Sequence, residues 1–338
     1  MSNKREEIQE LGYTTYTKDN GKQILVISQR VGKTLIGTRV INKFISNSKI
    51  NILVAVPYVD MINNWNNEFI KWFKEVPIYV KYTSFASLKK LDYIPDLLIV
   101  DEIQLLSQNN IDTIKDIPNI LGLTGTLSDD SKKLLWQQLR MKVTVDYPLM
   151  EAVKDGIVAN FHINLIGCEL DNTIRNIPSG TVKVPKIATE LEHYNFLTNR
   201  FEFFKRMSWG NPGLTNVKNQ MSGQRMRFIY DSKSKIEQVR KFLSTRKRKR
   251  ILIFAGSTAT ADYLNKNSFH SKTDSEALDL FLEGKINHLS SCKALNVGKT
   301  FPKLDTLVIQ QLNSNSETSS QIIARALTLD FKDKKAEI

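Results

Sequence analysis

The chain has 338 residues, of which 41% are hydrophobic and 25% are charged, a composition typical of a soluble globular protein long enough for two domains. No apolar stretch approaches the ~18 residues that a membrane span needs, and the charged start lacks the apolar run of a secretory signal, which argues against both classes. The formal net charge of +13 favours a polyanionic partner, of which nucleic acid is the commonest.

The first half of the chain alternates short apolar runs with helical patterns. Strands are expected at residues 23–27, 50–57, 78–83, 96–102 and 119–126, and helices at 35–45 and 59–76. Apolar runs this continuous are typical of parallel strands buried on both faces, with helices crossing over the sheet. The alternation therefore predicts a doubly wound α/β domain over residues 1–148.

The second half begins with a boundary region near residues 143–161 and continues into a polar, charged and mainly helical insertion at about 175–245. A second strand and helix pattern follows. Strands are expected at 251–257, 286–292 and 304–310, and helices at 258–266, 276–284 and 319–329. Residues 149–338 are therefore predicted to form a second α/β domain that is related to the first.

Residues 28–34, SQRVGKT, lie between an expected strand and an expected helix. Backbone amides at such a turn, together with the helix N-terminus, form an anion site. The phosphate-loop pattern G-x-x-x-x-G-K-[ST] is met except at its first position, where Ile27 stands. Lys33 would then reach the β- and γ-phosphates of a nucleotide, and Thr34 would ligate Mg²⁺.

Two adjacent carboxylates, Asp101 and Glu102, end the apolar run in PDLLIVDEIQLL. A carboxylate at the end of a buried parallel strand points to the carboxyl edge of the sheet, where ligands bind in such folds. Asp101 can hold the Mg²⁺ shell, and Glu102 can polarise an attacking water. The pair follows the phosphate-loop pattern in the same α/β unit, and the combination is more specific than either motif.

With DEIQ at residues 101–104, the chain resembles the superfamily 2 helicases and translocases in their DExQ form, of a compact phage or bacterial type. Further segments resemble the family's other motifs in order: LVAVPYVDMINNWNNEF, VKYTSFASL, LGLTGTL, KRILIFAGSTATADYL, FLEGKINHLSSCKALNVGKTFPKLDTLVI and SETSSQIIARAL. The resemblance implies two tandem RecA-like domains with an ATP cleft between them. It also implies ATP and Mg²⁺ as cofactors, and movement on or remodelling of nucleic acid.

Family roles carry over to single positions of this sequence. Arg30, Val31 and Gly32 would form the nucleotide loop, and Gln9 lies at a plausible distance upstream to read the adenine. Gln104 would link the nucleotide to Thr124, Gly125 and Thr126, which would couple the ATP state to domain movement. Gln321 and Arg325 would act from the second domain, with Arg325 as an arginine finger. The positions at which the family contacts the nucleic-acid backbone are Pro57, Tyr58, Thr83, Ser257 and Ser291.

Several positions depart from the family pattern. Thr328 replaces the second arginine of the last motif, and Ala324 replaces its glycine. Val297 and Thr300 replace two acidic residues that connect nucleic-acid binding to hydrolysis. We interpret Arg30 as an added positive charge on the loop side of the phosphates.

Three functions stay open. The first is an ATP-dependent helicase or translocase acting on DNA, single-stranded or branched, in replication, recombination or repair, as a monomer with possible protein partners from those pathways. The second is a packaging ATPase of the terminase type, which requires a nuclease with clustered acids. The third is a nucleic-acid-binding scaffold with weak or lost ATPase activity.

The remaining features favour ordinary structural roles. Cys168 and Cys292 lie far apart and the four histidines lack ligand spacing, so we expect free thiols in a reducing compartment and no metal site built from these residues. The family resemblance implies that this compartment is the cytoplasm of a bacterial or phage-infected cell. Trp65 and Trp72, seven residues apart on one expected helix, are interpreted as core or half-core packing, and the basic run 245–250 as a solvated turn.

Overall fold

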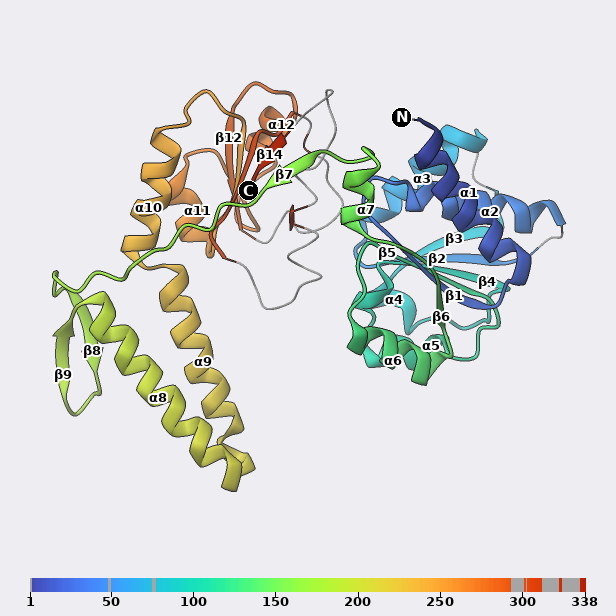
Figure 1. Cartoon of the computed structure of the whole chain (residues 1–338). Coiled ribbons are helices and arrows are strands. Elements are labelled where there is room, and N and C mark those ends of the chain that lie inside the picture. The colour runs from blue at the N-terminus through green and yellow to red at the C-terminus, as the bar shows by residue number, and fades with distance from the viewer. Residues whose placement is uncertain are drawn as a thin grey trace. The chain divides into compact units, whose positions relative to one another are not determined.

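The computed structural model describes residues 2–47, 50–74, 77–292, 301, 303–311, 322–323 and 335–338. The described residues form two compact units (Figure 1). One unit contains the chain from its start to Asn160, and the other is made mainly from Phe161 onward.

A six-stranded sheet forms the centre of the first unit. Its strands are β1 (Lys22–Ile27), β2 (Ile52–Val56), β3 (Val80–Ser84), β4 (Leu97–Asp101), β5 (Ile120–Thr124) and β6 (Lys142–Tyr147). They lie in the order β3-β2-β4-β5-β1-β6, and every pair of neighbours is parallel. All residues of β2, β4 and β5 are buried, as expected for a parallel sheet covered on both faces. This confirms the α/β class and the predicted strands.

The strand order brings distant motifs together. β4, β5 and β1 are adjacent, with Val26 opposite Thr124 and Asp101 opposite Leu123 in the register. Because the strands are parallel, their carboxyl ends lie at one edge of the sheet. The segments that follow these three strands therefore meet at that edge, although about a hundred residues separate the first from the last.

Helices cover both faces of this sheet (Figure 1). They are α1 (Ser2–Asp19), α2 (Lys33–Asn47), α3 (Asp60–Phe73), α4 (Phe85–Leu88), η1 (Ile103–Leu105), α5 (Gln108–Ile114), α6 (Asp129–Leu139) and α7 (Leu149–Lys154). α1 lies outside the elements expected from the sequence. α7 also lies in the first unit, so this unit extends past residue 148.

A second six-stranded sheet forms the centre of the other unit. Its strands are β7 (Asn160–His162), β10 (Ile251–Phe254), β11 (Ser268–Phe269), β12 (His288–Ser291), β13 (Thr306–Ile309) and β14 (Lys335–Glu337), in the order β11-β12-β10-β13-β14-β7. Helices α10 (Lys233–Ser244), α11 (Thr258–Leu264) and α12 (Glu276–Leu282) accompany it. The neighbours of β10 on both sides are parallel to it, as in the first sheet.

An arm extends from the second sheet between β7 and α10 (Figure 1). It consists of the antiparallel hairpin β8 (Ile177–Gly180) and β9 (Pro185–Ala188), and of the packed helices α8 (Glu190–Gly210) and α9 (Thr215–Tyr230), which a short turn η2 (Pro212–Leu214) joins. The sequence predicted the helices but not the hairpin. α8 is 21 residues long, yet neither it nor any other described helix is apolar enough to cross a membrane.

Polar contacts hold both ends of the arm to the second sheet's unit. At the start of α8, the buried Glu190 carboxylate accepts hydrogen bonds from the backbone N–H of Lys233 at 2.7 Å and of Asp171 at 3.1 Å. At the end of α9, Asp231 accepts from the Ser257 hydroxyl at 2.6 Å. Gln310, which follows β13, donates to the Tyr230 carbonyl at 3.1 Å. The arm is therefore fastened at two points.

Candidate nucleotide site

The loop between β1 and α2 has a tightly curled backbone. Arg30 (φ 70°) and Gly32 (φ 111°) both adopt left-handed conformations. The φ of Gly32 would strain any residue with a Cβ atom, and that atom would also displace Nε2 of Gln9, 2.5 Å away, so glycine is favoured at this position. Ile27 is the last residue of β1 and is fully buried, so it lies outside the curl. The missing first glycine is therefore no obstacle to the loop's conformation.

Lys33, the first residue of α2, extends across this loop. Its Nζ donates to the Ile27 carbonyl at 3.3 Å. A Cβ atom built on Gly125 would lie 3.4 Å from the same Nζ, so the ammonium group lies beside the segment after β5. Its positive charge also acts on Asp101, whose pKa it lowers against stronger opposing effects. The lysine side chain thus lies beside the ends of β1 and β5, and its charge acts on the carboxylate at the end of β4.

Asp101 and Glu102 are both buried at the end of β4. Burial, and next the charge of Glu102, raise the pKa of Asp101 to about 6. Three interactions oppose this rise: the charge of Lys33, a hydrogen bond from the indole of Trp65, and one from the Glu102 backbone at 3.1 Å. Glu102 itself has φ 50°, an uncommon conformation for a non-glycine residue and one that clusters at functional sites.

Trp65 is a site residue that the sequence analysis assigned only to packing. Its Nε1 donates to Oδ2 of Asp101 at 2.8 Å, and the side chain is 1% exposed. A Cβ atom on Gly37 of α2 would lie 2.5 Å from Cη2 of Trp65, so the indole lies directly on the helix that follows the loop. The helical spacing of apolar residues predicted that Trp65 packs against the core. Nothing in the sequence identified Asp101 as its hydrogen-bond partner.

Gln104 and the segment after β5 complete this edge. Nε2 of Gln104 donates to Oε2 of Glu102 at 2.9 Å. The Thr124 hydroxyl donates to the carbonyl of Thr126 at 2.6 Å and accepts from its backbone N–H at 3.2 Å, which closes a tight turn around Gly125. The link between Gln104 and this turn, and the coupling role of the turn, stay predictions.

Helix α1 lies over the loop and brings Gln9 to it. Nε2 of Gln9 donates to the Val31 carbonyl at 2.6 Å, and the Arg5 guanidinium donates to the carbonyl of Arg30. Arg39 of α2 pairs with Glu10 of α1 at 2.6 Å, which joins the two helices. Gln9 is therefore in contact with the loop, and its reading of adenine stays a prediction.

The predicted nucleic-acid residues fall on two sheet edges. Pro57 and Tyr58 follow β2, with Tyr58 53% exposed, and Thr83 lies near the end of the adjacent β3. Ser257 caps the start of α11 and donates to Asp231. Ser291 is fully buried at the end of β12, so its side chain is not on the surface. The contacts of all five with nucleic acid stay predictions.

Several predicted residues lie outside the described part of the chain. They are Gln321 and Arg325, and the departures at Val297, Thr300, Ala324 and Thr328.

Comparisons with known proteins agree with this arrangement. The family of helicase conserved C-terminal domains matches residues 234–328. A DNA 3'-5' translocase, XPB2 of Sulfurisphaera tokodaii, is 22% identical over a 340-residue alignment that covers 93% of this chain and 76% of the relative.

Two solved structures share the fold. Dbp5 of S. cerevisiae, bound to RNA and ADP BeF3, superposes with a TM-score of 0.58 at 12% identity, covering 98% of this chain and 81% of that one. A fragment of a putative HsdR subunit of a type I restriction enzyme from Vibrio vulnificus gives 0.62 at 14% identity, covering 98% of this chain and 62% of that one. The class is therefore that of tandem RecA-like proteins. The match to the helicase C-terminal family and the likeness to XPB2 support the resemblance to superfamily 2 helicases and translocases that the motifs indicate.

Proposed function

We propose that the chain is an ATP-dependent helicase or translocase that hydrolyses ATP to move on or remodel DNA. The supporting observation is the meeting of the Lys33 ammonium, the Asp101–Glu102 pair and the turn at 124–126 at one edge of the first sheet. Phosphoryl transfer to water needs a cation and carboxylates of this kind, and the tight loop before α2 adds an anion site at a helix start.

The residues present fit a magnesium ion. Thr34 of α2 offers a hydroxyl and Asp101 a carboxylate, and such oxygen donors suit this hard cation. When bound, the ion would offset the negative charge of the nucleotide phosphates. Two buried polar atoms at this edge, Oε1 of Gln104 and Oγ1 of Thr126, have no hydrogen-bond partner among the described residues. A polar ligand would supply such partners, which supports a binding role for this edge.

Each residue then has a distinct task in this proposal. Lys33 exchanges its bond to the Ile27 carbonyl for a phosphate oxygen, which suits a cation better than a neutral carbonyl does. Glu102 orients the attacking water and polarises its O–H bond by accepting a hydrogen bond from it. Arg30 adds positive charge beside the phosphates, and Gln9 holds the loop in the shape that receives them.

DNA is the proposed substrate because the relative XPB2 is named a DNA translocase and the chain carries a net charge of +13. Most of the affinity for a nucleic-acid backbone comes from such charge, so binding should weaken steeply with added salt. We assign this work to replication, recombination or repair, from the family resemblance.

The test is ATP turnover with and without single-stranded DNA, duplex DNA and RNA. Lys33→Ala and Glu102→Gln should each lower stimulated turnover by about 100-fold or more. Lys43→Ala, an exposed lysine on the same helix, is the matched control and should retain activity. Unchanged turnover in both site variants would refute the proposal.

The described residues add no observation that favours either of the other two functions over the proposed one. A terminase-type nuclease needs clustered acids, and within the described ranges no group of three or more His, Cys, Asp or Glu side chains is placed to hold a metal ion. A scaffold without ATPase activity would bind DNA and show no turnover, so the same assay separates it from the proposed enzyme.

A further inference from the structure

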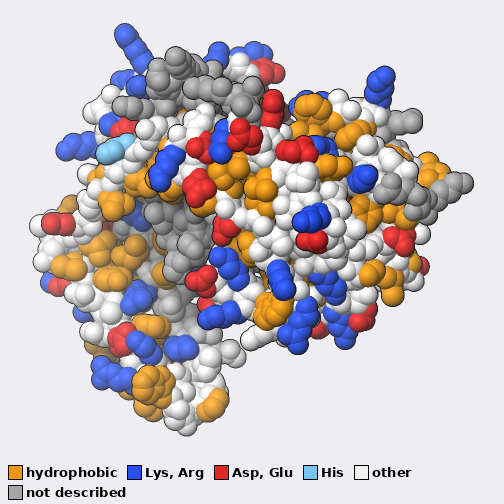
Figure 2. Space-filling model, turned by 45° about the vertical axis from the view of Figure 1, so that its right-hand side comes forward, with side chains coloured by type: hydrophobic (Ala, Val, Ile, Leu, Met, Phe, Trp, Pro, Cys, Tyr) orange, Lys and Arg blue, Asp and Glu red, His pale blue; other side chains and the backbone are white. Residues whose placement is uncertain are grey.

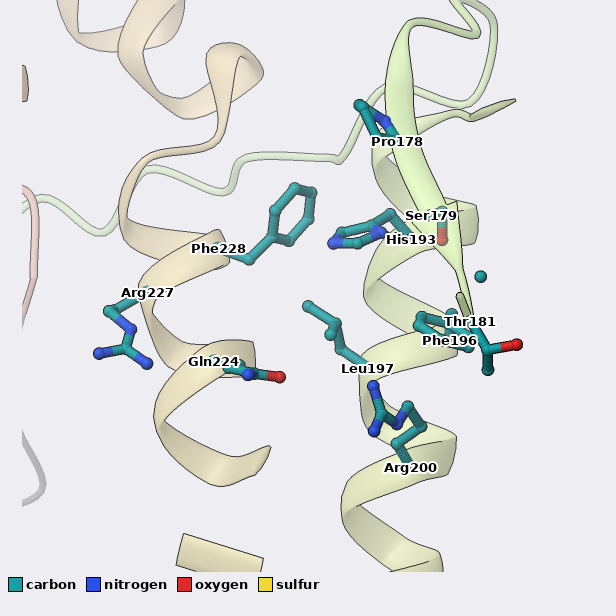
Figure 3. Close-up of a pocket in the computed structure, with 11 residues that line it drawn as sticks. Pro178, Ser179, Thr181, His193, Phe196, Leu197, Arg200, Gln224, Arg227 and Phe228 are labelled. Atoms are coloured by element: carbon teal, nitrogen blue, oxygen red, sulfur yellow. Dashed lines mark hydrogen bonds between the residues drawn. The ribbon is translucent and has the colours of Figure 1, made fainter. Parts of the chain in front are cut away.

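The arm contains a cavity of about 480 Å³ between its two helices and its hairpin. The hairpin contributes Ser179 and its neighbours, α8 contributes His193, Phe196 and Arg200, and α9 contributes Phe228 (Figure 3). The volume falls in the range of small-molecule sites, ~300–1,000 Å³. The cavity is formed by residues of the second unit and shares none with the nucleotide site.

The upper part of the cavity is aromatic. His193 and Phe228 face one another from the two helices, with centroids 4.8 Å apart and planes at 67° (Figure 3). His193 is held in place by a 2.9 Å hydrogen bond between its Nδ1 and the Ser179 hydroxyl. Burial, and next the charge of Lys186, lower the pKa of His193, so at neutral pH it contributes an uncharged ring. This wall offers flat, uncharged ring surfaces.

The lower part of the cavity is basic. The Arg200 guanidinium lies 5.7 Å from the centroid of the Phe196 ring, and Arg227 of α9 also belongs to the lining. Residues 195–230 contain six Lys and Arg but one acidic residue, Glu202. Glu202 lies 3.5 Å from Lys205, so its charge is offset locally. In Figure 2 the far end of the arm, lowest in the view, shows basic and hydrophobic side chains together.

We propose that this cavity binds one unpaired nucleotide of a nucleic-acid strand, with the base against Phe196 and Phe228 and a phosphate beside Arg200. A ring wall next to a guanidinium matches the two parts of a nucleotide, and stacking of a base on an aromatic ring favours binding of an unpaired strand. Charge complementarity with the phosphate backbone adds to this. The inference deepens the proposed function, because it adds a strand contact that does not need ATP.

The test is equilibrium binding of a labelled single-stranded oligonucleotide without ATP, in the Lys33→Ala background. Arg200→Gln and Phe228→Leu should each weaken binding about fivefold or more. Arg200→Gln should also reduce the slope of log K against log salt by ~0.7, the value for one lost single-strand phosphate contact. The control is Arg225→Gln, because this arginine lies over Phe201, outside the cavity lining, and its loss should change affinity little.

A photoreactive thymine in the strand gives a second measurement that does not depend on the stability of a variant. Crosslinks to peptides of α8 or α9 near the cavity support the inference. Crosslinks found only elsewhere, wild-type affinity in both cavity variants, or equally strong displacement of the strand by an acidic peptide would overturn it.

If Lys33→Ala abolishes turnover while the cavity variants bind normally, only this inference fails. If the cavity variants lose binding while Lys33→Ala keeps turnover, only the proposed function fails.

Discussion

Trp65 donates its indole N–H to Oδ2 of Asp101 at 2.8 Å, inside the core of the first unit. This bond ties the crossing helix α3 to the carboxylate proposed to hold magnesium. A buried carboxylate that accepts a well-formed hydrogen bond keeps its charge more readily, since the bond favours the ionised form. Trp65 is therefore a positioning residue.

Trp65→Phe should lower ATP turnover and shift its acid limb to higher pH. The bond from Trp65 lowers the pKa of Asp101, so its loss raises that pKa, and a higher pH is needed to keep the carboxylate charged. The shift should be ~0.7 pH unit, the equivalent of a hydrogen bond worth ~1 kcal/mol. Trp72→Phe on the same helix is the control, since Trp72 is exposed and bonds only Glu68 among the described residues. A pH profile that both variants leave unchanged would contradict the assignment.

Gly37→Ala should destabilise the protein, although Ala usually stabilises a helix interior by ~1 kcal/mol relative to Gly. The added Cβ would lie 2.5 Å from Cη2 of Trp65 and force the indole away from Asp101. Trp65→Phe removes that atom, so the double variant should lose less stability than the sum of the two single changes. Chemical denaturation of all four proteins measures this coupling, and simple additivity would count against it.

Arg30→Gly and Arg30→Asn should separate the conformation of Arg30 from its charge. Residue 30 has a φ of 70°, and glycine and asparagine adopt this backbone conformation at least as readily as arginine does. The stability of both variants should therefore be unchanged or slightly higher. ATP turnover should fall about tenfold in both, because each removes the positive charge near the phosphates. Thermal unfolding and steady-state kinetics give the two readouts. Undiminished turnover in Arg30→Gly would show that the charge plays no part.

Glu190→Ala should destabilise the second unit by ~2–4 kcal/mol. Its carboxylate, 4% exposed, accepts from the backbone N–H of Lys233, Asp171 and Ser234, and its loss removes the acceptor that Lys233 and Ser234 share. The matched control is Glu202→Ala, a partly exposed residue of the same helix, which should change stability by less than ~0.5 kcal/mol. Denaturant unfolding followed by circular dichroism compares them, and equal effects would disprove the anchoring role.

The sequence was sufficient to predict five of the six strands of the first sheet, all but β6, and the meeting of its motifs. β2, β4 and β5 are continuous apolar runs, and parallel strands place their carboxyl ends together, so the positions of Lys33 and Asp101 followed from topology. The bond from Trp65 to Asp101 could not be predicted. Helical period indicates which face of α3 is buried, but the partner of a buried indole depends on how that helix packs over a strand.

The arm shows a second limit. Its helices have recognisable patterns, but β8 and β9 are short and largely exposed, so they carry no buried alternation to signal a hairpin. Gly180 (φ 88°) is essential to the hairpin, since a Cβ atom there would lie 2.2 Å from the Val184 carbonyl. The cavity lining combines residues from three elements, and no spacing in one segment indicates it.

The two attachments of the arm have a mechanical consequence. α8 has 21 residues and is therefore ~30 Å long, while its partner α9 ends on the turns that follow β10 and β13. A rigid rod of this length, turned by about 10° at its base, moves its far end by ~5 Å. A small rotation of the two loops at the base of the arm would therefore move its far end by more than the distance between successive stacked bases.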